Sequence, residues 1–492
     1  MKKLLPLTLL ALSILLAYNI LTVSHDWGDD FAAYILQAVS ITQGDISGFL
    51  VHNSFTMQES TRFFGPDAYP WGFPLLLAPF TLACGPLNMF CLKFINLIFY
   101  ALFLFVFHKF LLRRLPALES TLLLAVFALS PVLLAHEDQV VSDIPFLFFS
   151  TLALLLIEDT ISISNPLGNP RKNIFLGIAL FFAYFVRTNG IILPATLFAS
   201  QIFLHIQSRT RSGPDWKRIL SIGLIPYYIF AALTIASLII FPSGEGSHFA
   251  RLTSLTLQKL SDNLSGYFVL AAGFFDSLPH NQVIYGILLP FIIGGAALRF
   301  KEDFHIIFYV LISYVLFILW PEWQGIRFIF PLLPFLIYFA LRGMLATSFA
   351  LTEQFQRIGL WLTRGFWSII VLVFALTSYG LASDNLANAR QLDDSPFEPI
   401  AAEMFNFINT NTPPDSVILF YKPRAMRLIT SRDALMIETC DALERGDYLV
   451  IRKKRGAVDQ VLPETAATCN AALTMTQVFE NKRYVIYQIF PQ

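Results

Sequence analysis

The chain has 492 residues, of which 55% are hydrophobic, 15% aromatic and only 14% charged. Soluble domains carry about 25% charged residues, so this composition excludes an ordinary soluble enzyme and a disordered chain. Lys and Arg balance Asp and Glu at 34 each, and this neutral sum excludes the basic balance of a nucleic-acid-binding protein.

The chain begins with a predicted membrane anchor. Residues 1–23 open with Lys2 and Lys3 and continue through about twenty mostly apolar residues, enough to cross a hydrocarbon core of about 30 Å. Because no small-x-small cleavage site precedes Ser24, the run favours an uncleaved anchor with a cytoplasmic N-terminus over a signal peptide. Hydropathy then predicts about eleven spans in all. The further predicted spans are 88–110, 117–135, 144–159, 173–187, 190–207, 219–241, 283–299, 304–320, 327–344 and 366–383.

The distribution of positive charge supports this topology. Short cytoplasmic loops concentrate Lys and Arg, and the threading places the cluster Arg113-Arg114 inside. Counting the apolar stretch 71–84 as a span would put that cluster outside, so we expect a short helix at the outer interface there. The basic residues before residue 384 that fall outside the cytoplasmic loops are Arg62, Lys93, Arg187, Arg251, Lys259 and Arg327.

Three aspartates follow the first span. If the chain is helical from about Asp26, then Asp26, Asp29 and Asp30 share one helix face. Carboxylates this close raise one another's pKa, which suits a general base or a set of ligands for a divalent cation. Alternatively, Asp29 and Asp30 cap the amphipathic helix that follows, and from the spacing alone capping is the commoner explanation.

A second acidic cluster, His136-Glu137-Asp138, lies at the outer end of a predicted span, and Asp143 begins the next span. Asp143 precedes Pro145, so a structural cap is one explanation for it. Both acidic clusters nevertheless reach the same side of the membrane, where ionisable groups near the hydrocarbon tend to mark function. We therefore predict that Asp138 and Asp143 contact the substrate.

Two outer arginines are candidates for binding an anion. Arg187 lies in a tight turn between spans, and Arg327 precedes a Pro-Leu-Leu-Pro run. Either side chain alone could simply reach lipid headgroups. Beside external carboxylates, they indicate a site for a phosphorylated ligand, because Arg matches phosphate oxygens with paired donors. The sequence has no Walker loop, GxSxG or HExxH motif, so it does not support ATP-driven transport or soluble hydrolase chemistry.

Residues 384–492 are predicted to form a separate, outward-facing α/β domain. Residues 397–408 have helical spacing, and 416–421, 448–451 and 484–490 are typical of strands. Cys440 and Cys469 either form a disulfide or stay free thiols. The basic runs Lys422-Pro423-Arg424 and Arg452-Lys453-Lys454-Arg455 are typical of a solvated surface, although they could also approach anionic lipid headgroups or the carrier phosphate.

Several short motifs follow one another along the membrane part. They are Gly28-Asp29-Asp30-Phe31 with Tyr34 and Ala38, Arg62-Phe63-Phe64, Tyr69-Pro70-Trp71-Gly72-Phe73-Pro74, Asp143 before Pro145, Arg187-Thr188-Asn189-Gly190, and Arg327. In this order they resemble the polytopic glycosyltransferases of the GT-C fold, which take sugars from polyprenyl-phosphate donors. Within that family the chain is most similar to the dolichyl-phosphate-mannose protein mannosyltransferase and aminoarabinose lipid A transferase group.

The resemblance implies a polytopic α-helical membrane protein with a GT-C-like catalytic domain at 1–383 and a large first outer loop at about 24–87. It implies that Asp29 is the catalytic residue, with Asp30 where the family usually has Glu. It also implies a divalent metal ion shared by Asp29 and Asp67, although the spacing of Asp67 to Pro70 is shifted by one residue.

We therefore expect an inverting transferase that moves a sugar from a polyprenyl-phosphate donor to a hydroxyl of a glycan, lipid or protein. Arg187 and Arg327 are expected to hold the donor phosphate, with Arg62 and Lys93 behind them. The site would face the periplasmic side of the cytoplasmic membrane. A transporter or flippase for a lipid-linked or anionic solute is the main alternative, but it predicts polar residues deep inside several spans, and these are scarce. A polymerase or ligase of lipid-linked glycans is a third.

Overall fold

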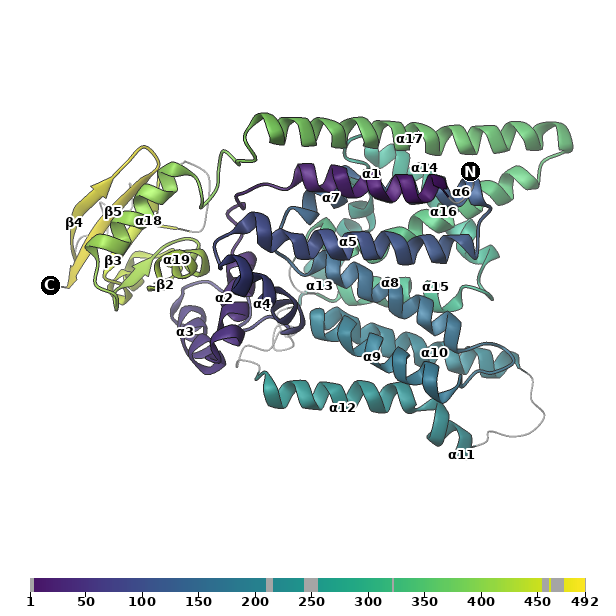
Figure 1. Cartoon of the computed structure of the whole chain (residues 1–492), viewed down its shortest axis with the longest axis horizontal. Helices are drawn as coiled ribbons and strands as arrows, with labels where there is room; N and C mark the ends of the chain where they lie inside the picture. The colour runs from purple at the N-terminus through teal and green to yellow at the C-terminus, as the bar shows by residue number, and fades with distance from the viewer. Residues whose placement is uncertain are drawn as a thin grey trace.

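The computed structural model describes residues 4–208, 216–242, 255–320, 323–453, 460–461 and 473–491. Arg251, Lys454, Arg455 and Cys469 lie outside these ranges. The described chain forms a bundle of long helices and a small domain built on a β-sheet. Figure 1 shows the long helices side by side, with the small domain next to one end of the bundle. We call this the domain end.

The bundle is apolar on its outer faces as well as inside. Ile239 on α12 is 78% exposed and Trp361 on α17 is 74% exposed. Such faces indicate a nonpolar solvent around the helices. The helices of the bundle are α1 (Leu4–Ile20), α5 (Met89–Leu112), α6 (Ala117–Ala128), α7 (Pro131–Glu137), α8 (Asp143–Thr160), α9 (Pro170–Val186), α10 (Ile192–Gln207), α12 (Ile225–Ile240), α13 (Leu257–Leu270), α14 (Asn281–Leu298), α15 (Phe304–Ile318), α16 (Leu333–Phe349) and α17 (Glu353–Ala387), with α11 (Trp216–Arg218) as a short turn before α12.

Several described helices meet the length and composition needed to cross a membrane. The four that do so alone are Met89–Leu112, Thr188–Gln207, Asn281–Leu298 and Phe355–Ala387. The shorter apolar helices, of 10–17 residues, are Leu5–Ile20, Gly72–Cys84, Ile225–Ile240, Phe304–Ile318 and Leu333–Phe349. The number of about eleven spans stays a prediction, because it depends on how many of the shorter helices also cross.

The predicted span at 117–135 is broken in two. α6 ends at Ala128 and α7 starts at Pro131, with a bend of 49° between them. The physical reason is local: Pro131 has no N–H to continue the helix, and the Ser130 hydroxyl accepts a hydrogen bond from the backbone N–H of Leu133. The break redirects the chain so that Asp138 follows α7 at the domain end.

The first loop folds into three helices at the domain end. They are α2 (Asp30–Gln43), α3 (Ile46–Glu59) and α4 (Gly72–Cys84). With 13 residues, α4 is too short to cross a hydrocarbon core. A disulfide between Cys84 and Cys91 joins the end of α4 to the start of α5. We did not expect this bond from the spacing of the cysteines.

Two glycines set the position of Arg187, which follows α9. A Cβ on Gly72, at the start of α4, would lie 2.4 Å from the backbone oxygen of Phe185. A Cβ on Gly190 would lie 2.4 Å from the backbone nitrogen of Tyr184. The 3₁₀ turn η1 (Thr188–Ile191) therefore folds tightly onto α9 while α4 packs from the other side. Arg187 is held where these three segments meet.

The C-terminal domain contains a five-stranded sheet in the order β2-β1-β3-β5-β4. β1 (Val417–Leu419) is parallel to β2 (Asp433–Leu435) and β3 (Tyr448–Arg452), whereas β5 (Tyr484–Pro491) is antiparallel to β3 and β4 (Leu473–Glu480). α18 (Pro399–Asn411) and α19 (Pro423–Thr430) pack with the sheet, and η6 (Cys440–Arg445) precedes β3. The predicted helix and three predicted strands are confirmed, while β2 and β4 were missed. Cys440 is in a disulfide. α17 continues to Ala387, past the predicted boundary at 383.

Candidate functional site

Two cavities meet at the domain end of the bundle. The first, of about 290 Å³, contains Arg187 and Arg327, and we call it the arginine pocket. The second, of about 600 Å³, contains Asp26 and Asp29, and we call it the acid pocket. The residues that line both are Asp30, Phe63, Phe64, Val141, Trp323 and Arg327. A molecule in one pocket therefore lies next to a molecule in the other.

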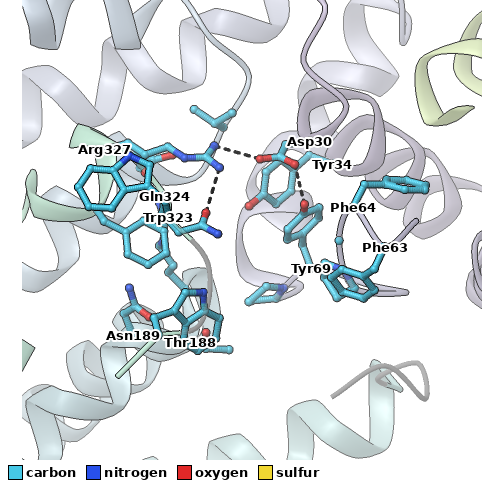
Figure 2. A pocket seen from close by; sticks show the side chains of 18 residues that line it. Asp30, Tyr34, Phe63, Phe64, Tyr69, Thr188, Asn189, Trp323, Gln324 and Arg327 are labelled. Carbon is cyan, nitrogen blue, oxygen red and sulfur yellow. Dashed lines mark hydrogen bonds and ion pairs between the residues drawn. The ribbon is translucent and has the colours of Figure 1, made fainter. Parts of the chain in front are cut away.

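Asp30 and Arg327 form an ion pair in this shared wall. Arg327 donates to Asp30 at 3.0 Å, and the Tyr69 hydroxyl donates to the other oxygen of Asp30 at 2.6 Å, as Figure 2 shows. Tyr69 is fixed through its backbone, which exchanges two hydrogen bonds with the Gln37 amide of α2. Burial alone would raise the pKa of Asp30, but Arg327 and Tyr69 outweigh it and lower that pKa. Asp30 is therefore a stable anion that orients Arg327.

Arg187 has its own acidic partner on the other side of the arginine pocket. It donates to Asp143, whose side chain is buried. The Arg187 guanidinium also lies over the ring of Phe328, 5.0 Å from its centre. Burial by itself would lower the pKa of Arg327, but Asp143 and Asp30 raise it above its ordinary value, so Arg327 stays charged. Two fixed cations face one cavity, and each guanidinium has five N–H donors with which to hold an anion.

Asp29 sits in a different environment from its neighbour. α2 begins at Asp30, and residues 21–29 are not helical, so the predicted common helix face of Asp26, Asp29 and Asp30 is wrong. Asp29 occupies the cap position of α2, but its side chain accepts no hydrogen bond from α2. It accepts one from the backbone N–H of Arg424, at 3.2 Å. The capping positions are therefore confirmed, with Asp30 in the first turn of α2, but the Asp29 side chain bonds to the start of α19 in the C-terminal domain and not to α2.

The neighbouring carboxylates Asp29 and Asp30 are shifted in opposite directions. Asp29 is 7% exposed, and burial raises its pKa above the ordinary value despite the opposing charges of Arg424 and Lys422. Asp30 shifts downward, as described above. A raised and a lowered carboxyl side by side are a recurring arrangement in acid–base catalysis, in which the group with the raised pKa exchanges the proton. Of the two carboxylates, Asp29 is the one with the raised pKa.

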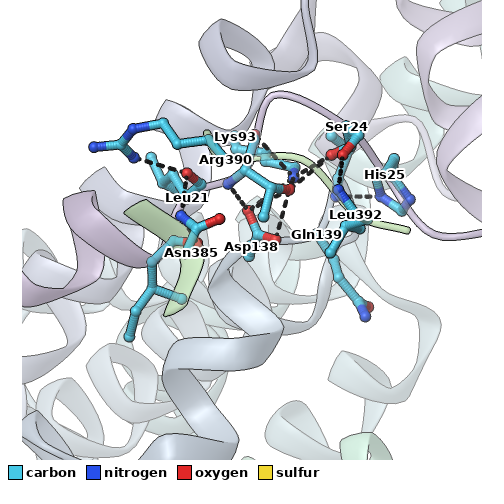
Figure 3. A network of polar contacts seen from close by, with 12 residues as sticks. Leu21, Ser24, His25, Lys93, Asp138, Gln139, Asn385, Arg390 and Leu392 are labelled. Atoms are coloured by element: carbon cyan, nitrogen blue, oxygen red, sulfur yellow. Dashed lines mark hydrogen bonds and ion pairs between the residues drawn. The ribbon is translucent and has the colours of Figure 1, made fainter. Parts of the chain in front are cut away.

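Lys93 and Asp138 are placed outside both pockets. The Lys93 ammonium donates to Asp138 at 2.7 Å and to the Thr22 hydroxyl and the Ser24 carbonyl, both at 2.6 Å. Figure 3 shows this network beside the segment that links α17 to the C-terminal domain. Leu392 of that segment donates to the Ser24 hydroxyl at 2.9 Å. Lys93 thus holds the chain segment that leads to Asp29. It does not line the arginine pocket, which contains the residues expected to hold the donor phosphate.

Replacing Lys93 with methionine is expected to lower stability. The change leaves the mostly buried Asp138 carboxylate without its cation. We expect this to lower the free energy of unfolding by about 3 kcal/mol. Thermal unfolding of the purified protein in detergent measures this loss, and the double variant Lys93→Met/Asp138→Asn should recover part of it. Unchanged stability together with weaker binding of a phosphorylated ligand would restore the substrate-binding role predicted from the sequence.

The other predicted residues are divided. Arg62 lines the acid pocket and lies 3.3 Å from Glu438 of the C-terminal domain. Lys259 is exposed on α13 and lines neither pocket. Asp67 is buried, accepts a hydrogen bond from Ser54 at 2.8 Å and lines neither pocket. In the described part of the chain, no group of three or more His, Cys, Asp and Glu side chains is arranged to hold a metal ion. Asp29 lines the acid pocket and Asp67 does not, so the metal ion that the resemblance implies stays a prediction.

The C-terminal domain supplies residues that the sequence analysis did not assign to the site. Lys422 and Met436 line the acid pocket, and Arg424 contacts Asp29. The interpretation of Lys422-Pro423-Arg424 as solvated surface is wrong for Arg424, which is 1% exposed. Arg452 is also buried and donates to Asp394. The only sequence signal for Lys422, Arg424 and Arg452 was the clustering of positive charge, which does not distinguish surface from interface.

No protein family model matches the chain, and no curated protein matches it in sequence. Solved structures share its fold. ArnT from Cupriavidus metallidurans in the apo state superposes with a TM-score of 0.57 at 13% identity, over 98% of this chain and 97% of that chain. ArnT from the same organism bound to undecaprenyl phosphate gives 0.59 at 14% identity, with the same coverage. The predicted GT-C-like membrane fold is confirmed, and the likeness extends through the C-terminal domain, beyond the motifs that suggested it.

Proposed function

We propose that the protein is a membrane glycosyltransferase that moves a sugar from an undecaprenyl-phosphate-linked donor to an acceptor hydroxyl. The observation that carries the proposal is the shared wall of the two pockets, where Asp30 is paired with Arg327 and adjoins Asp29 of the acid pocket. The ArnT fold supports it, because one ArnT structure is bound to undecaprenyl phosphate. A two-substrate reaction needs room for donor and acceptor side by side, and the two adjoining cavities provide it.

The arginine pocket suits the donor. Arg187 and Arg327 present fixed guanidinium groups for the phosphate, and both are already oriented by carboxylates. Trp323, Phe63 and other aromatic side chains provide apolar surface for the sugar ring and for the first part of the lipid. When the sugar leaves, negative charge develops on the phosphate, and the two arginines stabilise it.

The acid pocket suits the acceptor. Asp29 takes the proton of the acceptor hydroxyl while the oxygen of that hydroxyl forms a bond to the anomeric carbon. The bond from that carbon to the phosphate oxygen breaks, and its electron pair stays on undecaprenyl phosphate. Attack from the face opposite the leaving group inverts the anomeric configuration. Asp30 keeps Arg327 oriented during the reaction and remains ionised.

We propose that this site faces the outer, periplasmic side of the cytoplasmic membrane and that the N-terminus is cytoplasmic. The positive charges of the short loops favour this orientation. The disulfide Cys84–Cys91 and the oxidised Cys440 lie at the domain end and in the C-terminal domain, which fits an oxidising compartment. A glycan, a lipid or a protein would reach the acid pocket from that side.

The test uses the purified full-length protein with undecaprenyl-phosphate-linked sugars and total envelope lipid and glycan as acceptor. Mass spectrometry measures released undecaprenyl phosphate, and product analysis gives the anomeric configuration. The wild type should release it and a correctly inserted Asp29→Asn variant should not. A parallel reaction with a chelator tests the metal. No release from any donor would reject the proposal, and movement of the intact lipid across proteoliposomes without release would favour a flippase.

A further inference from the structure

Arg424 belongs to the C-terminal domain but is buried in the first loop of the bundle. Its side chain is 1% exposed and donates to the Asn53 amide oxygen at 3.1 Å and to the Met57 sulfur at 3.4 Å. The guanidinium also lies over the rings of Phe64 and Tyr69, at 5.1 Å and 5.4 Å from their centres. Removing a guanidinium from water is unfavourable unless charges and hydrogen bonds compensate. These contacts with Asn53, Met57, Phe64 and Tyr69 therefore form a specific binding site for the Arg424 side chain, which we call the socket.

The socket brings Arg424 to Asp29. Its side-chain Nε lies 3.8 Å from Oδ2 of Asp29, and its backbone N–H donates to Oδ1. The backbone N–H of Ala425 also donates to Asp29. Oδ2 of Asp29 accepts no hydrogen bond from the described residues. One oxygen is thus fixed by the start of α19, and the other is a buried acceptor that none of the described residues satisfies.

Gly65 leaves the space that the guanidinium occupies. A Cβ on this residue would lie 2.8 Å from a terminal nitrogen of Arg424 and 3.0 Å from the Tyr69 hydroxyl. The backbone of Gly65 is not left-handed, so alanine fits its conformation and differs in its close contacts with Arg424 and with the Tyr69 hydroxyl. Gly65→Ala therefore displaces the Arg424 guanidinium without removing its charge.

We propose that Arg424 is a positioning residue for Asp29, so that docking of the C-terminal domain completes the active site. The inference rests on the proposed role of Asp29 as general base. Among the described residues, α2 makes no capping hydrogen bond with the Asp29 side chain, and the segment before it is not helical. When α19 moves away, Asp29 loses its hydrogen bonds and its nearest cation, and the carboxylate is no longer aimed into the acid pocket.

The experiment compares Arg424→Gln with Arg424→Lys in the full-length protein, and Arg427→Gln is the matched control. Arg427 is on the same helix but pairs with Asp433 inside the C-terminal domain. The first readout is the pH profile of undecaprenyl phosphate release. The charged and titratable groups that face Asp29 are Asp30 on its own segment, Lys422 and Arg424 before and in α19, and His25, Asp26, Arg62 and Arg327 around the acid pocket.

Arg424→Gln should lower kcat about tenfold with little change in the donor KM, because the base is misplaced while the arginine pocket is intact. The acid limb of the pH profile of this variant should shift to higher pH by about one unit, because a cation that lowers the pKa of Asp29 is lost. Arg424→Lys should keep the wild-type limb, since the charge remains, but with a reduced kcat, since the planar fork is lost. Arg427→Gln should keep the wild-type profile.

The second readout needs no substrate. Hydrogen exchange of the amides at 26–43 and 423–430 should be faster in Arg424→Gln and in Gly65→Ala, and unchanged at 26–43 in Arg427→Gln. A wild-type pH profile and kcat in Arg424→Gln would overturn the proposal, as would wild-type values in Gly65→Ala if Arg424→Gln does not fold. If the wild type releases no undecaprenyl phosphate, the proposed function fails, and unchanged exchange at 26–43 would then reject the positioning contact separately.

Discussion

Replacing Asp29 with asparagine is expected to lower kcat for sugar transfer by at least about 100-fold. General bases contribute factors of this size, and asparagine keeps the shape of aspartate but cannot take a proton at neutral pH. The donor KM should change little, because Asp29 lines the acid pocket and does not line the arginine pocket. Single-turnover release of undecaprenyl phosphate, measured with saturating donor, isolates the chemical step.

The matched control is Asp30→Asn, which removes the neighbouring carboxylate. Asp30 is paired with Arg327, so its loss should mainly raise the donor KM by leaving that arginine without its orienting partner.

The pH profile gives a second test of the two aspartates. The wild type should become more active as the pH rises through the pKa of Asp29, because only the ionised carboxylate accepts the proton, and Asp30→Asn should keep this rise. If Asp29→Asn transferred normally and Asp30→Asn did not, the base would be Asp30.

The sequence could predict the two arginines of the arginine pocket because they are among the few positive residues outside the cytoplasmic loops. Arg187 and Arg327 are positive residues that hydropathy and charge bias place away from the cytoplasmic loops. The structure brings both to one cavity. Lys93 gave the same signal and lies in neither pocket, because a buried lysine can equally well neutralise a structural aspartate. Charge bias identifies the side of the membrane and leaves the partner undetermined.

The environment of Asp29 could not be predicted, because its partner is 395 residues away in sequence. Periodicity describes the faces of a single element, and α19 has only eight residues. The run Lys422-Pro423-Arg424 was visible as charge, but burial of Arg424 depends on a socket made by α3 and the loop around Gly65. Strand β2 was missed because its three residues hold too little pattern to detect. Strand β4 has eight residues, but a register shift between Gln477 and Phe479 interrupts its pairing with β5.

Replacing Arg327 with glutamine is expected to lower kcat by about 100-fold and to weaken binding of undecaprenyl phosphate. Removing one preorganised donor from a developing oxyanion typically has an effect of this size on kcat. Arg327 lines both pockets, so it adjoins the proposed positions of donor and acceptor. Binding of undecaprenyl phosphate in detergent, measured by calorimetry, separates the loss of affinity from the loss in kcat. Arg327→Lys should recover part of the affinity, because the charge remains without the paired donors.

Part of the loss of affinity for undecaprenyl phosphate in Arg327→Gln will come from Asp30, which is then an unpaired anion facing the incoming phosphate. The double variant Arg327→Gln/Asp30→Asn removes that repulsion and should bind undecaprenyl phosphate more tightly than Arg327→Gln alone. The difference between the two variants measures how strongly Asp30 repels the ligand when Arg327 does not shield it. Equal binding by the wild type and all three variants would mean that the lipid phosphate lies elsewhere. If only Arg187→Gln then weakened binding, Arg187 with Asp143 would be the phosphate site, and Arg327 would serve mainly to hold the Asp30 carboxylate.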